Sequence, residues 1–238
     1  MKIALIGYGK MGKAIEETAM QRGHEIVLKI DVDNLAEFNK ENLGKAEAAI
    51  EFTGPHTAYE NVKKAISMGI PLICGSTGWT DKLDEIKNLC KEKKGAFIYS
   101  SNFSVGVNIF FEINKRLASL ISSYTDYKPV IEETHHTQKK DAPSGTAISI
   151  AEQILEQNKR KKRWVNEESK NAEELVIVSK RIDPTPGTHS VKYFSAIDDI
   201  EIVHTAHNRK GFALGAVMAA EFIKDKKGVF TMKDVLNL

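Results

Sequence analysis

The sequence predicts an α/β protein of two domains, and three features indicate this fold class. Short apolar runs alternate with amphipathic stretches over the first hundred residues, as a parallel sheet with crossover helices requires. A glycine-rich turn follows the first apolar run. Beyond residue 103 several strand-like runs follow two helical patterns, which indicates a second, α+β domain built on a mostly antiparallel sheet. We expect one domain over 1–103, completed by a C-terminal helix in 212–238, and a second over 104–211.

Five strands and three helices are expected to alternate in the first domain. Each expected strand is a short apolar run, and the five lie at residues 3–6, 25–30, 46–52, 71–74 and 96–100. The expected helices are amphipathic, and they lie at residues 11–22, 58–68 and 81–93. This order is that of repeated βαβ units, in which each helix returns the chain to a parallel strand.

The second domain is expected to begin with a helix at 105–123 and a strand at 127–133. A polar loop follows, and then a helix whose apolar residues share one face, namely Ala147, Ile150, Ala151, Ile154 and Leu155. Three further strands are expected at 175–180, 189–195 and 200–207, and prolines and a glycine separate the first from the second. An apolar helix at 212–223 is expected to pack back on the first domain.

Composition and charge narrow the class of protein. The chain has 238 residues, of which 42% are hydrophobic and 28% charged, as in an ordinary globular protein. Thirty-four Lys and Arg against 32 Asp and Glu leave a net charge of +2, which indicates neither a nucleic-acid nor a membrane partner. Two cysteines allow one disulfide at most, and the opening apolar run is too short for a signal peptide. We expect a cytoplasmic protein.

The opening GYGKMG at 7–12 is a candidate dinucleotide-binding turn. Gly7, Gly9 and Gly12 follow an apolar strand and open a helix, which is the context that the G-x-G-x-x-G pattern requires. Glycine permits the tight turn and lets backbone amides approach a pyrophosphate, whose charge the helix N-terminus favours. The alternative is a plain strand-to-helix turn. The complete strand, helix and second strand favour a Rossmann dinucleotide-binding domain.

An acidic residue ends the second expected strand at the position of a ribose-binding carboxylate. Asp31 lies 19 residues after Gly12, close to the spacing of about 20 expected there. A carboxylate accepts hydrogen bonds from both ribose hydroxyls and repels a 2′-phosphate. We therefore expect NADH to be favoured and NADPH to be usable, since Lys29 lies nearby. Asp33 as the ribose partner, or both acids as turn residues, remain alternatives.

Two further strand ends of the first domain carry small polar residues. They are FTGP at 52–55 and GSTG at 75–78. Ligands of open α/β sheets lie across the carboxyl ends of the strands, so both loops are placed to contact a cofactor, although ordinary connections explain them almost as well. Cys74, which precedes the second loop, is expected to be a small core residue and not a nucleophile.

The polar loop of the second domain, residues 132–146, concentrates proton donors and cations. His135, His136 and Lys139 are followed by a Pro-Ser-Gly-Thr helix start, where the amides of Gly145 and Thr146 could bind a carboxylate. Such a loop would hold a small dianion. The residues alone leave open a capped helix after a solvated loop.

Metal binding and nucleic-acid binding are less favoured readings of two other patterns. Five of the seven histidines lie between His135 and His207, but adjacent histidines in a strand point to opposite faces, and no paired ligand motif supports a zinc site. We expect no metal. The basic run at 159–163 is expected to be a solvated tail at a helix end, because a single Trp164 beside it offers little for base stacking.

Taken together, these motifs resemble the 4-hydroxy-tetrahydrodipicolinate reductases, also called dihydrodipicolinate reductases, of the diaminopimelate route to lysine. The resemblance spans nearly the whole chain. It rests on GYGKMG at 7–12, GSTG at 75–78, SNFSVGVN at 101–108, ETHH at 133–136 with Lys139, and DAPSGTA at 141–147. The last block is long and chemically unusual, and is therefore specific.

The resemblance implies a Rossmann domain, a substrate domain that also builds a homotetramer, and a small dicarboxylate substrate reduced by a nicotinamide cofactor. It implies that His135 is the general acid and Lys139 its partner donor, and that His136, Lys139, Gly145 and Thr146 hold the substrate carboxylates. The cofactor positions that it implies or that the turn patterns indicate are Gly7, Gly9, Lys10, Met11, Gly12, Asp31, Gly75, Ser76, Thr77, Ser101, Asn102, Phe103 and Arg209.

This sequence departs from the family pattern in two places. The glycine turn is one residue shorter than usual, and RIDPTPGTH at 181–189 replaces the usual glycines after the arginine, which leaves the role of Arg181 open. Two other functions share the glycine turn: a different small NAD-dependent dehydrogenase, and a non-catalytic dinucleotide sensor that binds a partner through the basic run. Neither explains the His-His-Lys block.

Overall fold

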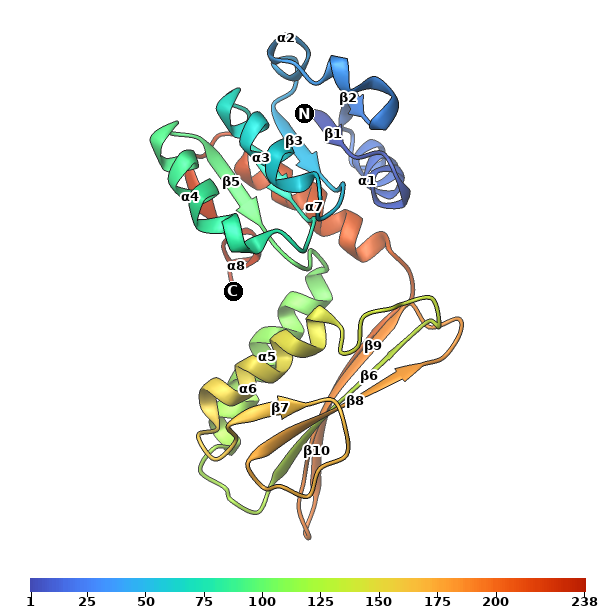
Figure 1. Cartoon of the computed structure of the whole chain (residues 1–238), viewed down its shortest axis with the longest axis vertical. Coiled ribbons are helices and arrows are strands. Elements are labelled where there is room, and N and C mark those ends of the chain that lie inside the picture. The colour runs from blue at the N-terminus through green and yellow to red at the C-terminus, as the bar shows by residue number, and fades with distance from the viewer. The chain divides into compact units, whose positions relative to one another are not determined.

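The computed structural model describes all residues from Met1 to Leu238 and divides into two compact units. Unit 1 consists of Met1–Val105 and Arg209–Leu238, and unit 2 of Gly106–Asn208. Each unit contains one sheet (Figure 1). None of the helices has the length and apolar character needed to cross a membrane.

The sheet of unit 1 has six strands in the order β11-β5-β4-β3-β1-β2, all parallel. The strands are β1 (Lys2–Ile6), β2 (Glu25–Ile30), β3 (Ala48–Glu51), β4 (Leu72–Cys74), β5 (Ala96–Tyr99) and β11 (Gly228–Phe230). The helices are α1 (Lys10–Gln21), α2 (Lys40–Leu43), α3 (Ala58–Ser67), α4 (Leu83–Glu92), α7 (Lys210–Ile223) and α8 (Met232–Leu236), with 3₁₀ turns at Val32–Glu37 and Thr80–Lys82. The predicted α/β class and the predicted parallel sheet are confirmed.

Helices cover both faces of this sheet, which explains why consecutive residues of its inner strands are apolar. In β1, Ala4 and Ile6 pack in one core cluster with α3 and α4, whereas Ile3 and Leu5 pack in the other with α1 and α7. The chain must therefore bury every residue from Ile3 to Ile6, as the sequence pattern indicates.

The apolar helix expected at 212–223 is present as α7, but the rest of the C-terminal segment, which was assigned to the same helix when the domain was bounded at 212–238, forms the strand β11 and the short helix α8 instead. The helix α7 ends at Ile223, four charged residues follow, and β11 then begins at a glycine with φ of +128°. Charged residues give no apolar face to bury, and the glycine conformation is one that other residues rarely adopt. β11 then pairs with β5 and extends the sheet by a sixth strand.

The sheet of unit 2 has five strands in the order β10-β9-β6-β8-β7. Its elements are α5 (Val105–Ile121), β6 (Lys128–His135), α6 (Gly145–Gln157), β7 (Arg163–Val165), β8 (Glu174–Arg181), β9 (Gly187–Phe194) and β10 (Asp199–Ala206). The sheet is mixed and not mostly antiparallel, because β6 pairs with β8, and β8 with β7, in parallel. The crossover through α6 explains this, since a helical connection returns the chain in the same direction.

Alternation along the central strand β6 decides where polar groups lie. Ile131, Glu133 and His135 point to the buried face, which α5 and α6 cover, whereas Glu132 and Thr134 point to the opposite face. His135 was expected in the loop after this strand, but β6 continues to it, because His135 pairs with Arg181 of β8. Glu133 and His135 therefore lie on the same buried face as the apolar Ile131 that precedes them in β6.

The basic run at 159–163 is mostly exposed, as expected, but two of its side chains are bound to the fold. The Arg160 guanidinium donates to the backbone carbonyls of Tyr124 and Thr125, and the Lys161 ammonium donates to that of Glu174. Arg163 begins the short strand β7. Arg160 and Lys161 thus bind carbonyl groups at the ends of other elements, which gives two of the five cations a structural role.

Candidate functional site

The three glycines of the turn between β1 and α1 have different roles. Two of them are required by close backbone packing, and the third leaves open space. A Cβ on Gly7, whose φ is +95°, would lie 2.3 Å from the Phe52 carbonyl oxygen, and one on Gly12 would lie 2.4 Å from the Gly7 carbonyl oxygen. A Cβ on Gly9 would meet nothing within 4 Å. Gly9 is the N-cap of α1 and supplies no capping side chain, so the helix N-terminus at Lys10 and Met11 can receive an anion.

The loops after β3 and β4 are tied together by a buried carboxylate that the sequence did not single out. Glu51 is completely buried, and its Oε1 accepts from the Thr53 amide at 2.9 Å and from the Ser76 hydroxyl at 3.1 Å. Its Oε2 accepts from the Cys74 thiol at 2.9 Å. Burial raises the pKa of that thiol well above its usual value, as suits a core residue. A Cβ on Gly75 would lie 2.1 Å from the Phe52 ring, so close packing also fixes this loop.

Asp31 caps the 3₁₀ turn that follows β2. Its Oδ1 accepts from the Val32 amide at 2.9 Å, while the residue as a whole is exposed at the edge of the sheet. Lys29, the nearby cation, lies 2.6 Å from the Glu16 carboxylate and 4.8 Å from the centre of the Tyr8 ring. Lys29 is therefore engaged by another acid.

The remaining predicted cofactor residues lie at two other places in unit 1. Phe103 is buried after β5, and its ring centre is 5.8 Å from that of Phe52. Asn102 accepts from the Ser104 amide, and Ser101 beside it is exposed. Arg209 is the N-cap of α7 and is exposed. The residues after β1, β2, β4 and β5 thus follow the carboxyl ends of their strands, whereas Arg209 precedes a helix.

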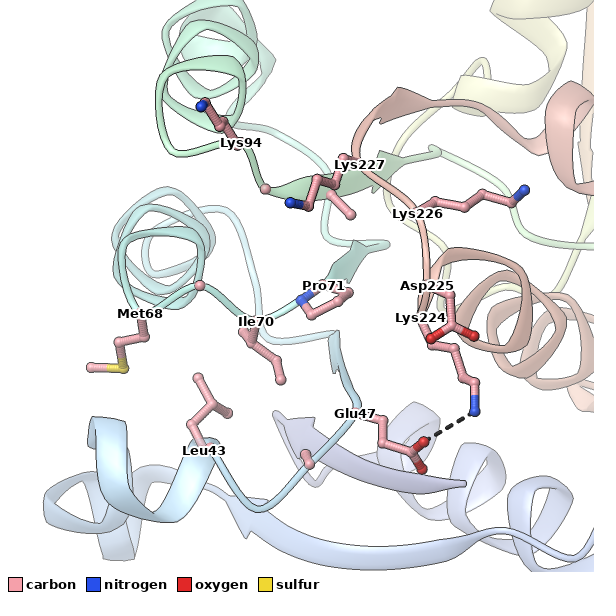
Figure 2. A pocket seen from close by; sticks show the side chains of 15 residues that line it. Leu43, Glu47, Met68, Ile70, Pro71, Lys94, Lys224, Asp225, Lys226 and Lys227 are labelled. Carbon is pink, nitrogen blue, oxygen red and sulfur yellow. Dashed lines mark hydrogen bonds and ion pairs between the residues drawn. The ribbon is translucent and has the colours of Figure 1, made fainter.

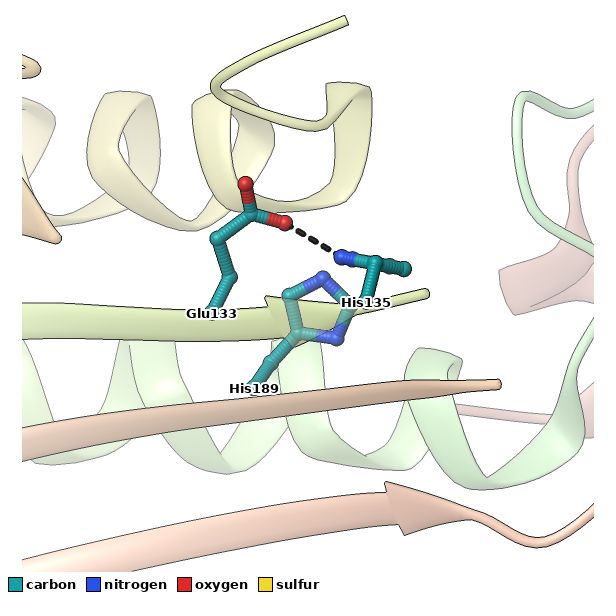
Figure 3. Close-up of side chains that lie close together, drawn as sticks. All are labelled: Glu133, His135 and His189. Atoms are coloured by element: carbon teal, nitrogen blue, oxygen red, sulfur yellow. Dashed lines mark ion pairs between the residues drawn. The ribbon is translucent and has the colours of Figure 1, made fainter. Parts of the chain in front are cut away.

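In unit 2, a carboxylate and two imidazoles meet on the buried face of the sheet (Figure 3). His135 Nδ1 lies 2.6 Å from Glu133 Oε2, and the His135 and His189 rings are edge to face with centres 5.0 Å apart. Glu133 is completely buried, and the two histidines are 8% and 5% exposed. A Cβ on Gly187 would lie 3.0 Å from His135 Nε2, so the glycine leaves room for that side of the imidazole.

Arg181, whose role the sequence left open, belongs to this cluster. Its guanidinium lies 3.0 Å from Glu133 Oε1 and donates to the backbone carbonyls of Lys139 and Asp141. Burial raises the pKa of Glu133, but the contacts with His135, Ser179, Arg181 and Ser144 outweigh it and hold that pKa well below its usual range. Glu133 is therefore ionised across the physiological pH range.

His189 is the neutral member of the cluster. Burial, and then the nearby His135, lower the pKa of His189 from 6.5 to about 3. Its Nε2 lies 3.1 Å from the Ser144 hydroxyl oxygen, which in turn accepts from the Ala147 amide and caps α6. An uncharged imidazole thus links the strand β9 to the start of that helix.

The other predicted substrate residues surround the start of α6. Lys139 is bound by both Asp141 carboxylate oxygens at 2.8 Å and does not contact His135. Gly145 is exposed in the first turn of α6, a Cβ there would meet nothing within 4 Å, and Thr146 follows it. His136 lies just beyond β6, where its backbone carbonyl accepts from the Lys139 amide. One loop and one helix terminus therefore carry a cation, an imidazole and amide groups.

The cluster of Glu133, His135 and His189 has metal-ligating side chains, but its geometry fits an acid-imidazole pair better. The three candidate ligand atoms lie within 4.8 Å of one another. Two ligand atoms of one ion, each bonded at about 2.1 Å, lie more than about 3 Å apart. The 2.6 Å contact between Glu133 and His135 is shorter, and the other Glu133 oxygen binds the Arg181 cation.

A cavity of about 480 Å³ in unit 1 contains none of the predicted site residues (Figure 2). It lies at the amino-terminal ends of β3, β4 and β5, opposite the edge where the candidate cofactor loops emerge. Among its lining residues, Lys224 is paired with Glu47 at 3.1 Å. The site described above therefore does not coincide with this cavity.

The low pKa of His189 predicts a specific loss of stability in acid. The unfolded chain binds a proton at His189 below pH 6.5 and the folded chain only near pH 3, so this contribution is complete above pH 6.5 and falls as the pH decreases. When the pH is lowered from 7 to 5, the unfolding free energy of the wild type should fall because His189 resists protonation in the fold. In His189→Gln that fall should be smaller by about 2 kcal/mol. Urea unfolding followed by circular dichroism measures it. His56→Gln, at an exposed histidine, should behave like the wild type, and an unchanged pH dependence in His189→Gln would contradict the assignment.

Comparison with known proteins identifies the family of this chain. The family model for the N-terminus of dihydrodipicolinate reductase matches residues 1–103, and the model for its C-terminus matches 106–236. A 4-hydroxy-tetrahydrodipicolinate reductase of Christiangramia forsetii is 51% identical over 237 residues, covering 100% of this chain and 98% of that protein. One of Methanocaldococcus jannaschii is 36% identical, covering 98% of this chain and 81% of that protein.

Among solved structures, the dipicolinate-bound dihydrodipicolinate reductase of Paenisporosarcina sp. TG-14 has a similar fold. The TM-score is 0.76 at 24% identity, and 97% of each chain is covered. A probable dehydrogenase of Thermotoga maritima also matches, with a TM-score of 0.57 at 12% identity over 99% of this chain and 92% of that chain. Both family models and the identity over the full length lead to one conclusion: this chain belongs to the dihydrodipicolinate reductase family.

Proposed function

We propose that the protein is a 4-hydroxy-tetrahydrodipicolinate reductase of the diaminopimelate route to lysine, and that it uses a reduced nicotinamide cofactor. The observation that carries the proposal is the 51% identity, over the full length, to a reductase of that name. The geometry of unit 2 supports it, because His135 lies beside a buried carboxylate and close in sequence to the start of α6. The cofactor supplies a hydride, which adds to C4 of the cyclic imine formed when the 4-hydroxy substrate loses water.

His135 is the general acid of this proposal. Nδ1 faces Glu133, so Nε2 is the nitrogen that gives a proton to the enamine left by hydride addition. Burial of the imidazole limits exchange of that proton with water. Lys139 is the partner donor, and a dianionic substrate competes with Asp141 for its ammonium group.

The substrate carboxylates are assigned to His136, Lys139 and the amides of Gly145 and Thr146. A buried carboxylate without partners costs several kcal/mol, roughly, so cations and helix amides must converge on each one. The loop between β6 and α6 supplies both kinds of group within 11 residues, from His136 to Thr146. A small dicarboxylate fits that set better than a neutral ligand does.

The cofactor is assigned to the loops of unit 1 at the carboxyl ends of its strands. The pyrophosphate is placed at Gly9, Lys10 and Met11, where the turn has open space and the helix begins. The adenosine ribose is placed at Asp31. The other proposed contacts are Gly7, Gly12, Gly75, Ser76, Thr77, Ser101, Asn102, Phe103 and Arg209.

Self-association and location complete the proposal. We propose a homotetramer that associates through the face of the unit 2 sheet opposite α5 and α6, on which Val203 is 57% and Phe194 40% exposed. A monomeric mass in sedimentation equilibrium at micromolar concentration would contradict it.

We place the protein in the cytoplasm, since Cys74 and Cys90 are both free thiols in the fold.

Two substitutions test the catalytic assignment. We expect His135→Gln and Lys139→Ala each to lower kcat by about 10²-fold or more, because each removes a proton donor or a cation from the reaction. The assay supplies aspartate semialdehyde, pyruvate and the upstream synthase, and follows the loss of reduced-nicotinamide absorbance. Lys140→Ala, at the exposed neighbour of Lys139, is the control and should retain activity. Near-native turnover in His135→Gln would contradict the role of this histidine as the general acid. If the wild type does not oxidise the reduced nicotinamide in this assay, the proposed function is wrong.

The cofactor preference is tested at Asp31. We expect kcat/KM to be higher with NADH than with NADPH, because the Asp31 carboxylate repels a 2′-phosphate and Lys29 is engaged by Glu16. Asp31→Ser should reduce the ratio of the two kcat/KM values by about tenfold, in line with about 1.4 kcal/mol of lost repulsion. Asp33→Ser is the matched control. Equal efficiency of the wild type with both cofactors would refute the preference.

A further inference from the structure

We propose that Glu133 is the positioning residue of unit 2, and that its single carboxylate fixes both the proton donor and the loop that binds the substrate anion. The inference rests on the proposed function and goes beyond it, because Glu133 itself neither donates a proton nor contacts the substrate. Its role is to hold three groups from different elements in one arrangement.

The contacts of Glu133 account for both carboxylate oxygens. Oε1 accepts from the Arg181 guanidinium at 3.0 Å and from the Ser144 amide at 3.2 Å. Oε2 lies 2.6 Å from His135 Nδ1. The partners come from β8, from the N-cap of α6 and from the end of β6. A completely buried carboxylate without these donors would be strongly disfavoured, so the side chain cannot leave them without cost.

The contact with Nδ1 decides which nitrogen of His135 is available. A carboxylate beside Nδ1 keeps a hydrogen on that nitrogen, so Nε2 becomes the atom that releases or accepts the second proton. Nε2 faces the side of the imidazole that Gly187 leaves clear. Glu133 therefore sets both the tautomer of the acid and the direction in which the proton leaves.

The contacts with Arg181 and Ser144 extend the same constraint to the substrate loop. Arg181, held by Glu133, donates to the Lys139 and Asp141 carbonyl groups at 3.3 and 2.5 Å. Ser144, held through its amide, caps the first turn of α6 with its hydroxyl. The loop carrying the Lys139 cation and the helix start carrying the Gly145 amide are thus both anchored on one carboxylate.

The charges around His135 predict how the pH profile of the reaction depends on Glu133. On β6 it faces the Glu133 carboxylate, whose other oxygen binds the Arg181 guanidinium of β8, and the loop that follows carries the ion pair of Lys139 with Asp141. From β9 and β10 it faces neutral His189 and, behind it, His204. Without the Glu133 charge, the Arg181 cation would lose its counter-charge and act on the imidazole with less opposition. The basic limb of the pH–rate profile would then move to lower pH.

Glu133→Gln tests this proposal, with Glu174→Gln as the matched control. Glu174 is also a buried acid held by an arginine and a serine, but it lies at the opposite end of β8. We expect Glu133→Gln to lower kcat at least tenfold and to move the basic limb of the kcat/KM pH profile about one unit lower, while the control stays within twofold of the wild type. The NADH dissociation constant, a property of unit 1, should stay within twofold. A kcat within twofold of the wild type and an unmoved profile would overturn the role.

A second measurement tests the role of Glu133 without an activity assay. ¹⁵N NMR of the imidazole groups, with His135 assigned by comparison with His135→Gln, should show hydrogen on Nδ1 in the neutral wild type. Hydrogen on Nε2 instead would overturn the proposal even if the enzyme is active.

If Glu133→Gln does not fold, Glu133→Asp keeps the charge and shortens the side chain. It should keep the pH midpoint and lower kcat, and unchanged kcat would count against positioning. If the wild type does not reduce the proposed substrate, the proposed function fails while the NMR result still decides the role of Glu133.

Discussion

A buried carboxylate at the end of a central strand is the interaction on which each candidate site depends. Glu133 ends the apolar face of β6 and is neutralised by Arg181, with the Ser144 amide and His135 around it. In unit 1, Glu51 ends β3 and is surrounded by neutral donors only. Because burial makes an unpartnered carboxylate expensive, each one draws neighbouring loops toward it. Polar loops that would otherwise be free are thereby held at the end of a sheet.

The two units divide the chemistry according to what their sheets provide. The parallel sheet of unit 1 places its loops at the carboxyl ends of the strands, where Gly9 leaves open space in front of α1. The mixed sheet of unit 2 brings β6, β8 and β9 together, so that an acid, an arginine and two imidazoles lie on one buried face. A cofactor of extended shape suits the first arrangement, and a small, doubly charged ring suits the second.

Much of the fold followed from local patterns, and the exceptions have physical reasons. The strand β1 shows as a continuous apolar run and the helix α6 as an apolar face of helical period, and both were predicted. The three-residue strands β7 and β11 are too short for any period, and both form because a neighbouring strand offers hydrogen bonds. The assignment of His135 to a loop failed for a similar reason, since its place in β6 depends on pairing with Arg181.

By itself, the sequence determined the glycine turn, the apolar strands and the dense polar block that contains His135, Lys139 and Gly145, because each of these is a local pattern of side chains. The partnership of Glu133 with Arg181, and of His135 with His189, was decided only by the tertiary structure. Arg181 lies 48 residues after Glu133, and the register of β8 and β9 against β6 brings them together. Strand register is set by distant pairing and packing, so no local pattern could specify which of several charged residues would share that buried face.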